Sequence, residues 1–359
     1  MRRFLSRVLP LLLSFGLILN CTGCSTVLVL AGKARENSEA SSSVISESSA
    51  SSGVISAPVP TEDGDLRAFY TDVANAESVT VMVYMIGSDL ESEDGSATDD
   101  LLEMADAALS ENIHLVLQTG GTETWWNDVC TDGESERFVI ENGDMTLLQS
   151  LGSVNMTDAD TLSDFIRFSA ESYPADRYEL ILWDHGGGTM TGFGYDELYE
   201  DTSLTLSSLS TALYNGGVQF DFIGFDACLM ATAEVAYALE PYADYLIASE
   251  ESEPGEGWAY KNWLTMLAED PAVPTAELGK KLADDFLEAY IFADMPTLSV
   301  LDLRYVPELY AALESYWGSA YTALQSGSYG AFSQVRSNVR EFGDNEYDQV
   351  DLSDLATLT

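Results

Sequence analysis

The sequence predicts an α/β fold with a mainly parallel sheet and helices on both faces. From about residue 75 onward, short apolar and β-branched runs alternate with segments of helical spacing. The runs are continuously apolar, which is typical of strands covered on both faces. Of the 359 residues, 46% are hydrophobic and 21% are charged, an ordinary globular balance. A chain of this length and composition can bury a sizeable core.

The expected elements follow one another along this part of the chain. We expect strands at 79–85, 113–118, 178–183, 218–225 and 245–248. Apolar residues at helical spacing predict helices at 99–109, 162–170, 204–214 and 230–239. Thr205 or Ser203 is the expected cap of the third helix. Repeated strand–helix units favour a parallel sheet, whose binding sites lie beyond the carboxyl ends of the strands.

Residues 1–23 have the features of a lipoprotein signal peptide. Three arginines precede an apolar stretch at 8–19, which is shorter than the roughly 20 residues of a membrane-spanning helix. The small residues before Cys24 are similar to a bacterial lipobox, although Cys21 stands where that pattern usually has Leu. We therefore expect lipidation of Cys24 and anchoring at the bacterial cell surface. Ordinary signal cleavage followed by secretion is the alternative.

Residues 24–74 are predicted to be a Ser-rich flexible tether, because this composition cannot bury enough apolar surface to offset its ordering entropy. The folded domain is then expected at 75–359. The sequence stops soon after 350–352 without a clear stop signal, so a C-terminally truncated domain remains an alternative.

The charge balance excludes several kinds of partner. The chain has 15 Lys and Arg against 60 Asp and Glu, a formal net charge of -45. Nucleic acid is excluded because almost nothing could neutralise its phosphates, and anionic lipid headgroups are disfavoured for the same reason. We expect a monomer that contacts the membrane through a lipid anchor only. Four Cys are too few for a disulfide scaffold, and no Cys/His cluster indicates a metal site.

Two motifs place a His and a Cys after predicted strands. Residues 182–188 read Leu-Trp-Asp-His-Gly-Gly-Gly around His185, and residues 224–231 read Gly-Phe-Asp-Ala-Cys-Leu-Met-Ala around Cys228. A thiolate is a nucleophile that an imidazole and a helix N-terminus would favour, and we expect Cys228 to open a helix. A Cys after a strand is more often a small buried hydrophobe. The two motifs together, on consecutive strand ends, favour a Cys–His dyad.

These motifs resemble the clostripain family of cysteine peptidases, in the caspase-like group. The resemblance covers roughly residues 78–359 and includes the segments 81–85, 155–158, 173–176, 253–258 and 350–352. It implies that His185 is the catalytic base and acid and that Cys228 is the nucleophile. The backbone N–H groups of Gly186 and Cys228 would form the oxyanion hole. The other histidine, His114, lies within a predicted strand and is expected to be structural.

The resemblance also implies an endopeptidase that cleaves polypeptides after Arg or Lys and forms an acyl-enzyme intermediate. This specificity needs an acid in the S1 pocket, which holds the side chain before the scissile bond. Asp226 and Glu256 stand at matching positions, although relatives can have Asp at the second; Glu250 and Glu251 are weaker candidates. No Lys or Arg lies between 186 and 227, so we expect no self-cleavage there.

No cofactor is required by this chemistry, and calcium binding is left open. The acidic segment 89–95 lacks the Gly that an EF-hand loop has at its sixth position. The alternative function is a non-catalytic surface binding or adhesion module that keeps the peptidase fold. In that case Trp125, Trp126 and Trp258 would be the binding aromatics.

Overall fold

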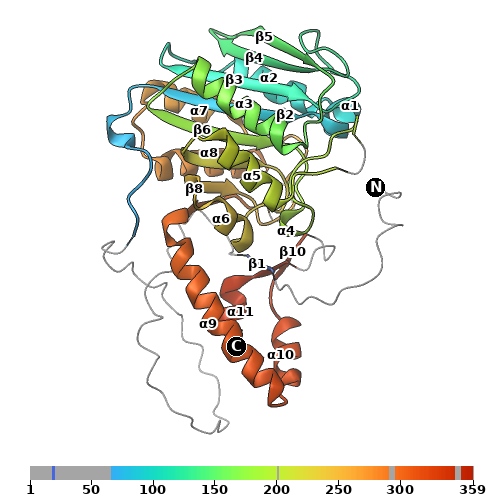
Figure 1. Cartoon of the computed structure of the whole chain (residues 1–359), viewed down its shortest axis with the longest axis vertical. Helices are drawn as coiled ribbons and strands as arrows, with labels where there is room; N and C mark the ends of the chain where they lie inside the picture. The colour runs from blue at the N-terminus through green and yellow to red at the C-terminus, as the bar shows by residue number, and fades with distance from the viewer. Residues whose placement is uncertain (1–17, 21–65, 200–201, 291–295, 344–348, 359) are drawn as a thin grey trace.

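The computed structural model describes residues 18–20, 66–199, 202–290, 296–343 and 349–358 (Figure 1). The strands are β1 (Ile18–Asn20), β2 (Val79–Ile86), β3 (Ile113–Gly120), β4 (Ser135–Glu141), β5 (Asp144–Gly152), β6 (Arg177–Trp183), β7 (Phe220–Asp226), β8 (Ala243–Ala248), β9 (Ser299–Asp302), β10 (Glu341–Phe342) and β11 (Gln349–Asp351). The α-helices are α1 (Ser88–Asp94), α2 (Ser96–Ala105), α3 (Ala159–Ser172), α4 (Gly188–Thr191), α5 (Leu206–Gly216), α6 (Ala233–Leu239), α7 (Tyr260–Glu269), α8 (Thr275–Ala289), α9 (Val306–Gln325), α10 (Tyr329–Arg336) and α11 (Leu352–Leu358).

The central sheet has eight strands in the order β5-β4-β3-β2-β6-β7-β8-β9. The five neighbouring strands β3, β2, β6, β7 and β8 run parallel to one another. Strands β4 and β5 on one side of them and β9 on the other pair antiparallel. All five predicted strands are present, as β2, β3, β6, β7 and β8. The predicted mainly parallel α/β sheet is confirmed.

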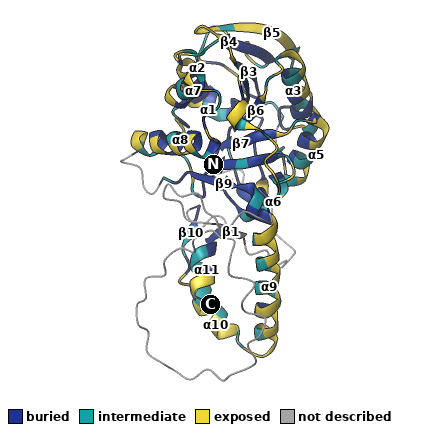
Figure 2. Cartoon of the chain, turned by 90° about the vertical axis from the view of Figure 1, so that its left-hand side faces the viewer, coloured by how far each residue is buried: buried dark blue, intermediate teal, exposed yellow. Residues whose placement is uncertain are grey.

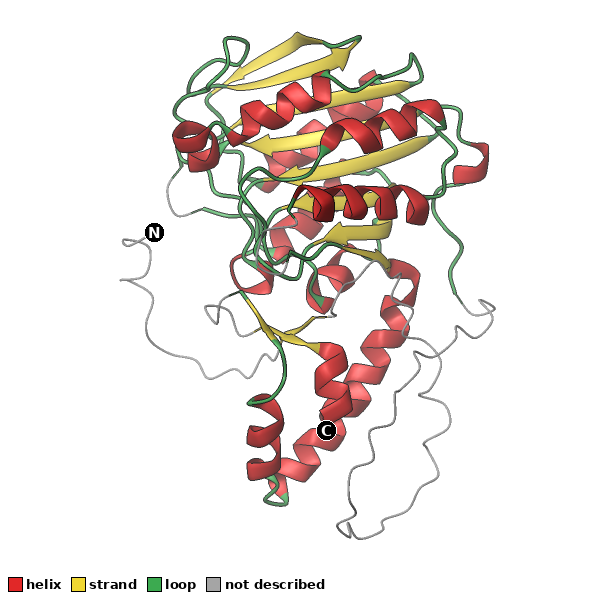
Figure 3. Cartoon of the chain, turned by 180° about the vertical axis from the view of Figure 1, so that it is seen from behind, coloured by secondary structure: helices red, strands yellow, loops and turns green. Residues whose placement is uncertain are grey.

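Helices lie against both faces of this sheet (Figure 3), and a buried core lies on each face. Along β2, Val81 and Val83 belong to one buried cluster, while Met82 and Tyr84 belong to the other. Residues of α2, α7 and α8 complete the first cluster, and residues of α3, α5 and α6 complete the second. Alternate side chains of a strand point to opposite faces, so a continuously apolar strand requires helices on both.

In the central sheet, the strands β4, β5 and β9 were not predicted, and several helix boundaries differ from the prediction. Strand β5 is largely exposed at the edge of the sheet, so it lacks the apolar run that marks the buried strands. Helix α2 begins and ends earlier than the predicted 99–109, and α6 begins at Ala233 rather than at residue 230. The predicted cap of the third helix is correct, because the Thr205 side chain accepts a hydrogen bond from the Ser208 N–H.

A second, smaller body extends from the sheet and contains the long helix α9 (Figure 2). It includes α10, α11 and a three-stranded sheet in the order β1-β11-β10, around a small cluster that includes Val339, Val350 and Leu355. Strand β1 falls within the predicted signal peptide. Cys24 and most of the predicted tether lie outside the described residues, and in the described part no helix is long and apolar enough to cross a bilayer.

Candidate active site

Three neighbouring strand ends bring the candidate catalytic side chains together. Strand β6 lies between β2 and β7, and Trp183 is in register with Met85 on one side and Asp226 on the other. Strand β6 ends at Trp183 and β7 ends at Asp226, and His185 and Cys228 each lie two residues after these paired strand ends. Asp89, in the first turn of α1, follows the end of β2. The sheet register therefore places both motifs at one edge, as the sequence predicted.

His185 has an acidic partner that the sequence analysis did not identify. Its Nε2 lies 2.7 Å from Oδ1 of Asp89, and both side chains are partly exposed. This hydrogen bond lowers the pKa of the Asp89 carboxyl. Burial lowers the pKa of His185, but the bond to Asp89 and the charge of Asp184 outweigh burial, so the net pKa is raised. The bond to Asp89 thus orients the ring through Nε2.

Asp184, next to the histidine, holds the turn that carries Asp89. Its buried carboxylate accepts a hydrogen bond of 2.7 Å from Ser88 Oγ and another from the Tyr195 N–H. Ser88 adopts a φ of 49°, a left-handed conformation that costs about 1 kcal/mol in a residue with a Cβ. The bond from Ser88 to Asp184 offsets this cost and keeps Asp89 next to His185. Burial raises the pKa of Asp184 to about 7.

Cys228 lies in a loop rather than at the start of a helix. The next residue, Leu229, has a φ of 66°, and α6 begins only at Ala233, where Thr232 provides the cap. The prediction that Cys228 opens a helix is therefore wrong, and helix α6 cannot favour the thiolate directly. Burial raises the pKa of the thiol, although the Glu253 N–H donates to Sγ at 3.2 Å.

The backbones of the two motifs are in contact. A Cβ added at Gly186 would lie 2.1 Å from the carbonyl oxygen of Cys228, so only glycine fits beside the nucleophile loop. The side chain of Gln349, on β11, also contacts the loop of Cys228, because its Nε2 donates to the Leu229 carbonyl at 3.5 Å. These contacts fix the position of the loop that carries the thiol relative to the strand end that carries His185.

A buried acidic cluster, formed by Asp100, Asp226 and Glu253, lies beside the nucleophile loop. Asp226 accepts hydrogen bonds from the Trp258 N–H and the Tyr260 hydroxyl, and Trp183 Nε1 donates to Asp100. A Cβ at Gly257 would lie 2.9 Å from oxygens of both aspartates, which shows how closely the two carboxyl groups approach. Within the described residues, no Lys or Arg forms an ion pair with this cluster.

Burial raises the pKa values of this acidic cluster. Burial raises the pKa of Asp226 to about 6, and burial together with the charge of Asp226 raises the pKa values of Asp100 and Glu253 well above their usual range. A cationic side chain placed here would lower all three values and be bound in return.

The other predicted residues occupy different environments. Glu256 is exposed in the loop between β8 and α7, whereas Glu250 is buried and accepts a hydrogen bond from Ser299 Oγ. Glu251 accepts one from the Gly343 N–H. His114 is the second residue of β3, at the amino edge of the sheet, where its ring packs on Tyr173. His114 and His185 therefore lie at opposite edges of the sheet.

The acidic segment considered for calcium is helical in the structure. Residues 88–94 form α1, in which Asp89 contacts His185 and the buried Glu91 accepts hydrogen bonds from Thr98 and the Trp126 N–H. No group of three or more His, Cys, Asp or Glu residues in the described part of the chain could hold a metal ion. Calcium binding stays a prediction without a described site.

Asp89, Asp100 and Glu253 are the site residues that sequence reasoning missed. Asp89 had a usable signal, since it follows the end of a predicted strand just as the two motifs do. Asp100 and Glu253 had none, because in a chain with 60 acids only the fold distinguishes them from surface charges.

A caspase-like sheet with a Cys and a His on neighbouring strand ends defines the class of the protein: it has the architecture of a cysteine peptidase. The family model of the clostripain family matches residues 83–359. Clostripain of Hathewaya histolytica is 29% identical over 217 residues, which are 51% of this chain and 41% of that protein. The match thus spans less than half of that relative's length.

Solved structures give the same result for the fold. A secreted C11 cysteine protease from Bacteroides thetaiotaomicron, in complex with an irreversible peptide inhibitor, is 23% identical with a TM-score of 0.54. That match covers 66% of this chain and 68% of the other. An inactive zymogen C11 protease from Parabacteroides distasonis is 24% identical with a TM-score of 0.57, over 78% and 76% of the two chains. The chain belongs to the clostripain family of cysteine peptidases.

Proposed function

We propose that the protein is a cysteine endopeptidase that cleaves polypeptides after Arg or Lys. One arrangement carries this proposal: the Asp89–His185 pair at 2.7 Å lies on strand ends adjacent to the loop of Cys228, beside a buried acidic cluster without a cation. A nucleophile, a base and a third group that orients the base are the elements of nucleophilic acyl transfer.

In the proposed acylation step, the Cys228 thiol transfers its proton to Nδ1 of His185 as sulfur attacks the scissile carbonyl carbon. The negative oxygen is stabilised by the backbone N–H groups of Gly186 and Cys228, whose segments are in contact. The His185 imidazolium then protonates the leaving amine. Asp89 favours this step because it stabilises the charged ring.

In the deacylation step, His185 takes a proton from water, and the resulting hydroxide attacks the thioester carbon of the acyl-enzyme. The oxyanion forms at the same position, and its collapse releases the carboxylic acid product and the thiolate. His185 returns the proton to sulfur. The raised thiol pKa means that the base is needed for the first attack.

The specificity part of the proposal rests on the acidic cluster. Asp226 is two residues before Cys228, and we assign the cluster to the side chain of the substrate residue whose carbonyl is attacked. Because the three carboxyl groups have no cationic partner in the described chain, an Arg or Lys side chain would supply the missing charge. Glu256, which is exposed, would contribute at the rim.

We also propose that the enzyme acts at the bacterial cell surface through a lipid on Cys24. Support comes from the sequence of residues 1–24. Secretion without an anchor remains the alternative, and the similar C11 protease from Bacteroides thetaiotaomicron is a secreted protein. Incorporation of radiolabelled palmitate by the wild-type chain but not by Cys24→Ala distinguishes the two.

The alternative function, a non-catalytic binding module, loses most of its proposed binding surface. Trp125 and Trp258 are buried, with 7% and 1% of their surface exposed, so neither can offer its ring to a partner. Only Trp126, at 61% exposure, could do so.

Substitution of the dyad tests the proposed function. Cys228→Ala and His185→Ala should each reduce hydrolysis of Arg and Lys peptides to background, because each removes a group required for acyl transfer. His114→Ala is the matched control and should keep wild-type kcat/KM, since its ring packs at the opposite edge. Undiminished hydrolysis by Cys228→Ala would contradict the assigned nucleophile.

Asp89→Asn tests the orienting role. We expect kcat to fall about 10- to 100-fold, with KM changed little, because the imidazolium loses its charged partner. The pKa that kcat reports for His185 should move down, since the bond to Asp89 raises it. A fall in kcat without this shift would indicate a merely structural role.

A further inference from the structure

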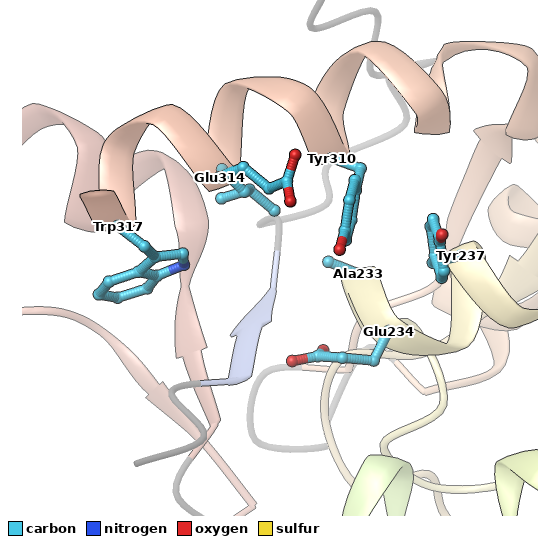
Figure 4. Close-up of a pocket in the computed structure, with 7 residues that line it drawn as sticks. Ala233, Glu234, Tyr237, Tyr310, Glu314 and Trp317 are labelled. Atoms are coloured by element: carbon cyan, nitrogen blue, oxygen red, sulfur yellow. The ribbon is translucent and has the colours of Figure 1, made fainter. Parts of the chain in front are cut away.

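A groove of about 470 Å³ lies between α6 and α9, apart from the acidic cluster at Cys228. Its polar groups are the carboxylates of Glu234 and Glu314, and its aromatic walls are Tyr237, Tyr310 and Trp317. Figure 4 shows the two carboxylates projecting from facing helices into the space between them. This combination of negative charge and aromatic surface is the recognition chemistry of a cation.

The carboxylates of the groove lack a cationic partner. Oε2 of Glu234 is buried without a hydrogen-bond partner, and burial raises the pKa of this group although Thr189 partly compensates. No ion pair to Glu234 or Glu314 occurs among the described residues. A buried carboxylate oxygen without a donor is costly, and an entering ammonium or guanidinium group would satisfy it.

The aromatic rings present exposed surface at the groove. Tyr237 and Tyr310 stack with centroids 4.6 Å apart, yet 52% and 44% of their surfaces remain exposed. Tyr310, Glu314 and Trp317 recur on α9 at four- and three-residue spacing, so they share one face of the helix. Two stacked and exposed tyrosines beside two carboxylates are not needed for the core, which lies on the sheet.

The groove is within reach of a substrate held at the nucleophile. Glu234 follows Cys228 by six residues, so the two backbones are at most about 20 Å apart. Helix α6 is also linked to the glycine motif, because Thr232 and Thr189 hydrogen-bond through their hydroxyls at 3.1 Å. An extended peptide of at most about six residues therefore connects the two places.

We propose that this groove is an exosite that binds a second Lys or Arg side chain of the polypeptide substrate. The ammonium or guanidinium group pairs with Glu234 and Glu314, and the aliphatic stem packs on the tyrosines. The kinetic consequence rests on the proposed peptidase function, whereas the binding itself does not. The enzyme would then prefer polypeptides with two basic residues at a fixed spacing.

Equilibrium binding tests the exosite without cleavage. The probe is a fluorescein-labelled peptide series with one fixed Arg and a second Lys placed two to eight residues away on either side, measured by anisotropy with the Cys228→Ala chain. At one favoured spacing the second Lys should tighten binding about 5- to 20-fold relative to norleucine at the same place. Glu234→Gln combined with Glu314→Gln should remove this gain.

The matched control is Glu288→Gln combined with Glu308→Gln, which removes the same charge from exposed positions on α8 and α9 outside the groove. This variant should keep the gain. The proposal is overturned if no spacing shows a gain, if norleucine binds as well as Lys, or if the groove variant keeps the full effect. Retained cleavage by Cys228→Ala would instead refute the proposed nucleophile and leave the binding result intact.

Discussion

The two edges of the central sheet both bury carboxyl groups, but only the amino edge pairs them with Arg. At the amino edge, Arg177 lies 2.7 Å from Asp221 and 3.1 Å from Glu179, and Arg67 lies 2.7 Å from Asp244. At the carboxyl edge, the described residues provide only Trp and Tyr donors and backbone N–H groups to Asp100 and Asp226.

The difference separates a structural role from a binding role. Asp221 accepts hydrogen bonds from Arg177 Nε and Thr275 Oγ1 in the free protein, so removal of its basic partner affects the fold. A buried carboxyl cluster without a cation is electrostatically unfavourable in the free protein, and a cationic ligand relieves this. The acids at the carboxyl edge thus fit substrate recognition, in keeping with the position of binding sites in parallel sheets.

The largest expected effect is on specificity at the carboxyl edge. Asp226→Asn should raise the activation free energy for Arg and Lys peptides by about 3–5 kcal/mol, which lowers kcat/KM by about two to four powers of ten, because a buried cation loses its partner. Its melting temperature should not fall, since Asn can still accept the bonds from Trp258 and Tyr260. Peptides with citrulline before the scissile bond are the control and should be cleaved as by wild type.

Substitution of the other acids at the carboxyl edge should affect cleavage after Arg or Lys less. Glu256→Gln should lower kcat/KM for Arg and Lys peptides at most about tenfold, because exposed ion pairs contribute little binding energy. Glu250→Gln should leave the Arg preference unchanged, since Ser299 Oγ donates to its Oε1 and a Gln side-chain oxygen can accept the same bond. An unchanged preference in both Asp226→Asn and Glu256→Gln would show that another acid, or another specificity, applies.

At the amino edge the expected effect is on stability instead. Arg177→Met leaves Glu179 and Asp221 buried without their cation and should lower the free energy of unfolding by about 3–5 kcal/mol. Urea denaturation measures this. Arg167→Met, which removes a partly exposed pair with Asp164, should cost less than about 1 kcal/mol. Equal losses in the two variants would refute the structural role of the buried Arg.

A smaller effect should appear in the pH profile. Burial raises the pKa of Asp226 to about 6, so below this pH the carboxyl takes up a proton and can no longer pair with a cation. The ratio of kcat/KM for an Arg peptide to that for its citrulline analogue should therefore fall up to tenfold per pH unit below about 6. The ratio cancels the titration of His185. Asp226→Asn should flatten it, and a pH-independent wild-type ratio would contradict the assignment.

The last prediction is that the chain is not cleaved between the two motifs. Residues 186–227 contain no Lys or Arg, and Arg137 and Arg177 are buried within the domain. Mass spectrometry of the active protein should thus find His185 and Cys228 on one polypeptide. An active form that has cut itself between them would break the link between specificity and the acidic cluster.

How far the sequence predicts this protein depends on the range of the contacts involved. The parallel strands, the helix cap at Thr205 and the strand-end positions of His185 and Cys228 follow from local patterns, and the structure has them. The exposed edge strand β5 and the late start of α6 escaped prediction. Strand β5 has little buried apolar surface. The start of α6 depends on hydrogen bonds between the loop of Cys228 and the residues after β8, such as the bond from the Leu229 N–H to the Glu251 carbonyl.

The sequence by itself determined which elements form and which two motifs stand at strand ends, because apolar periodicity and turn residues act within a few positions. Only the tertiary structure decided that Asp89 joins His185 across 96 positions, that Asp100 and Asp226 share one buried cluster, and that α9 faces α6 across a groove. Those pairings depend on strand order, register and helix packing. They bring together side chains that are far apart in the sequence, and no local pattern records which of the 60 acids will be buried without a cation.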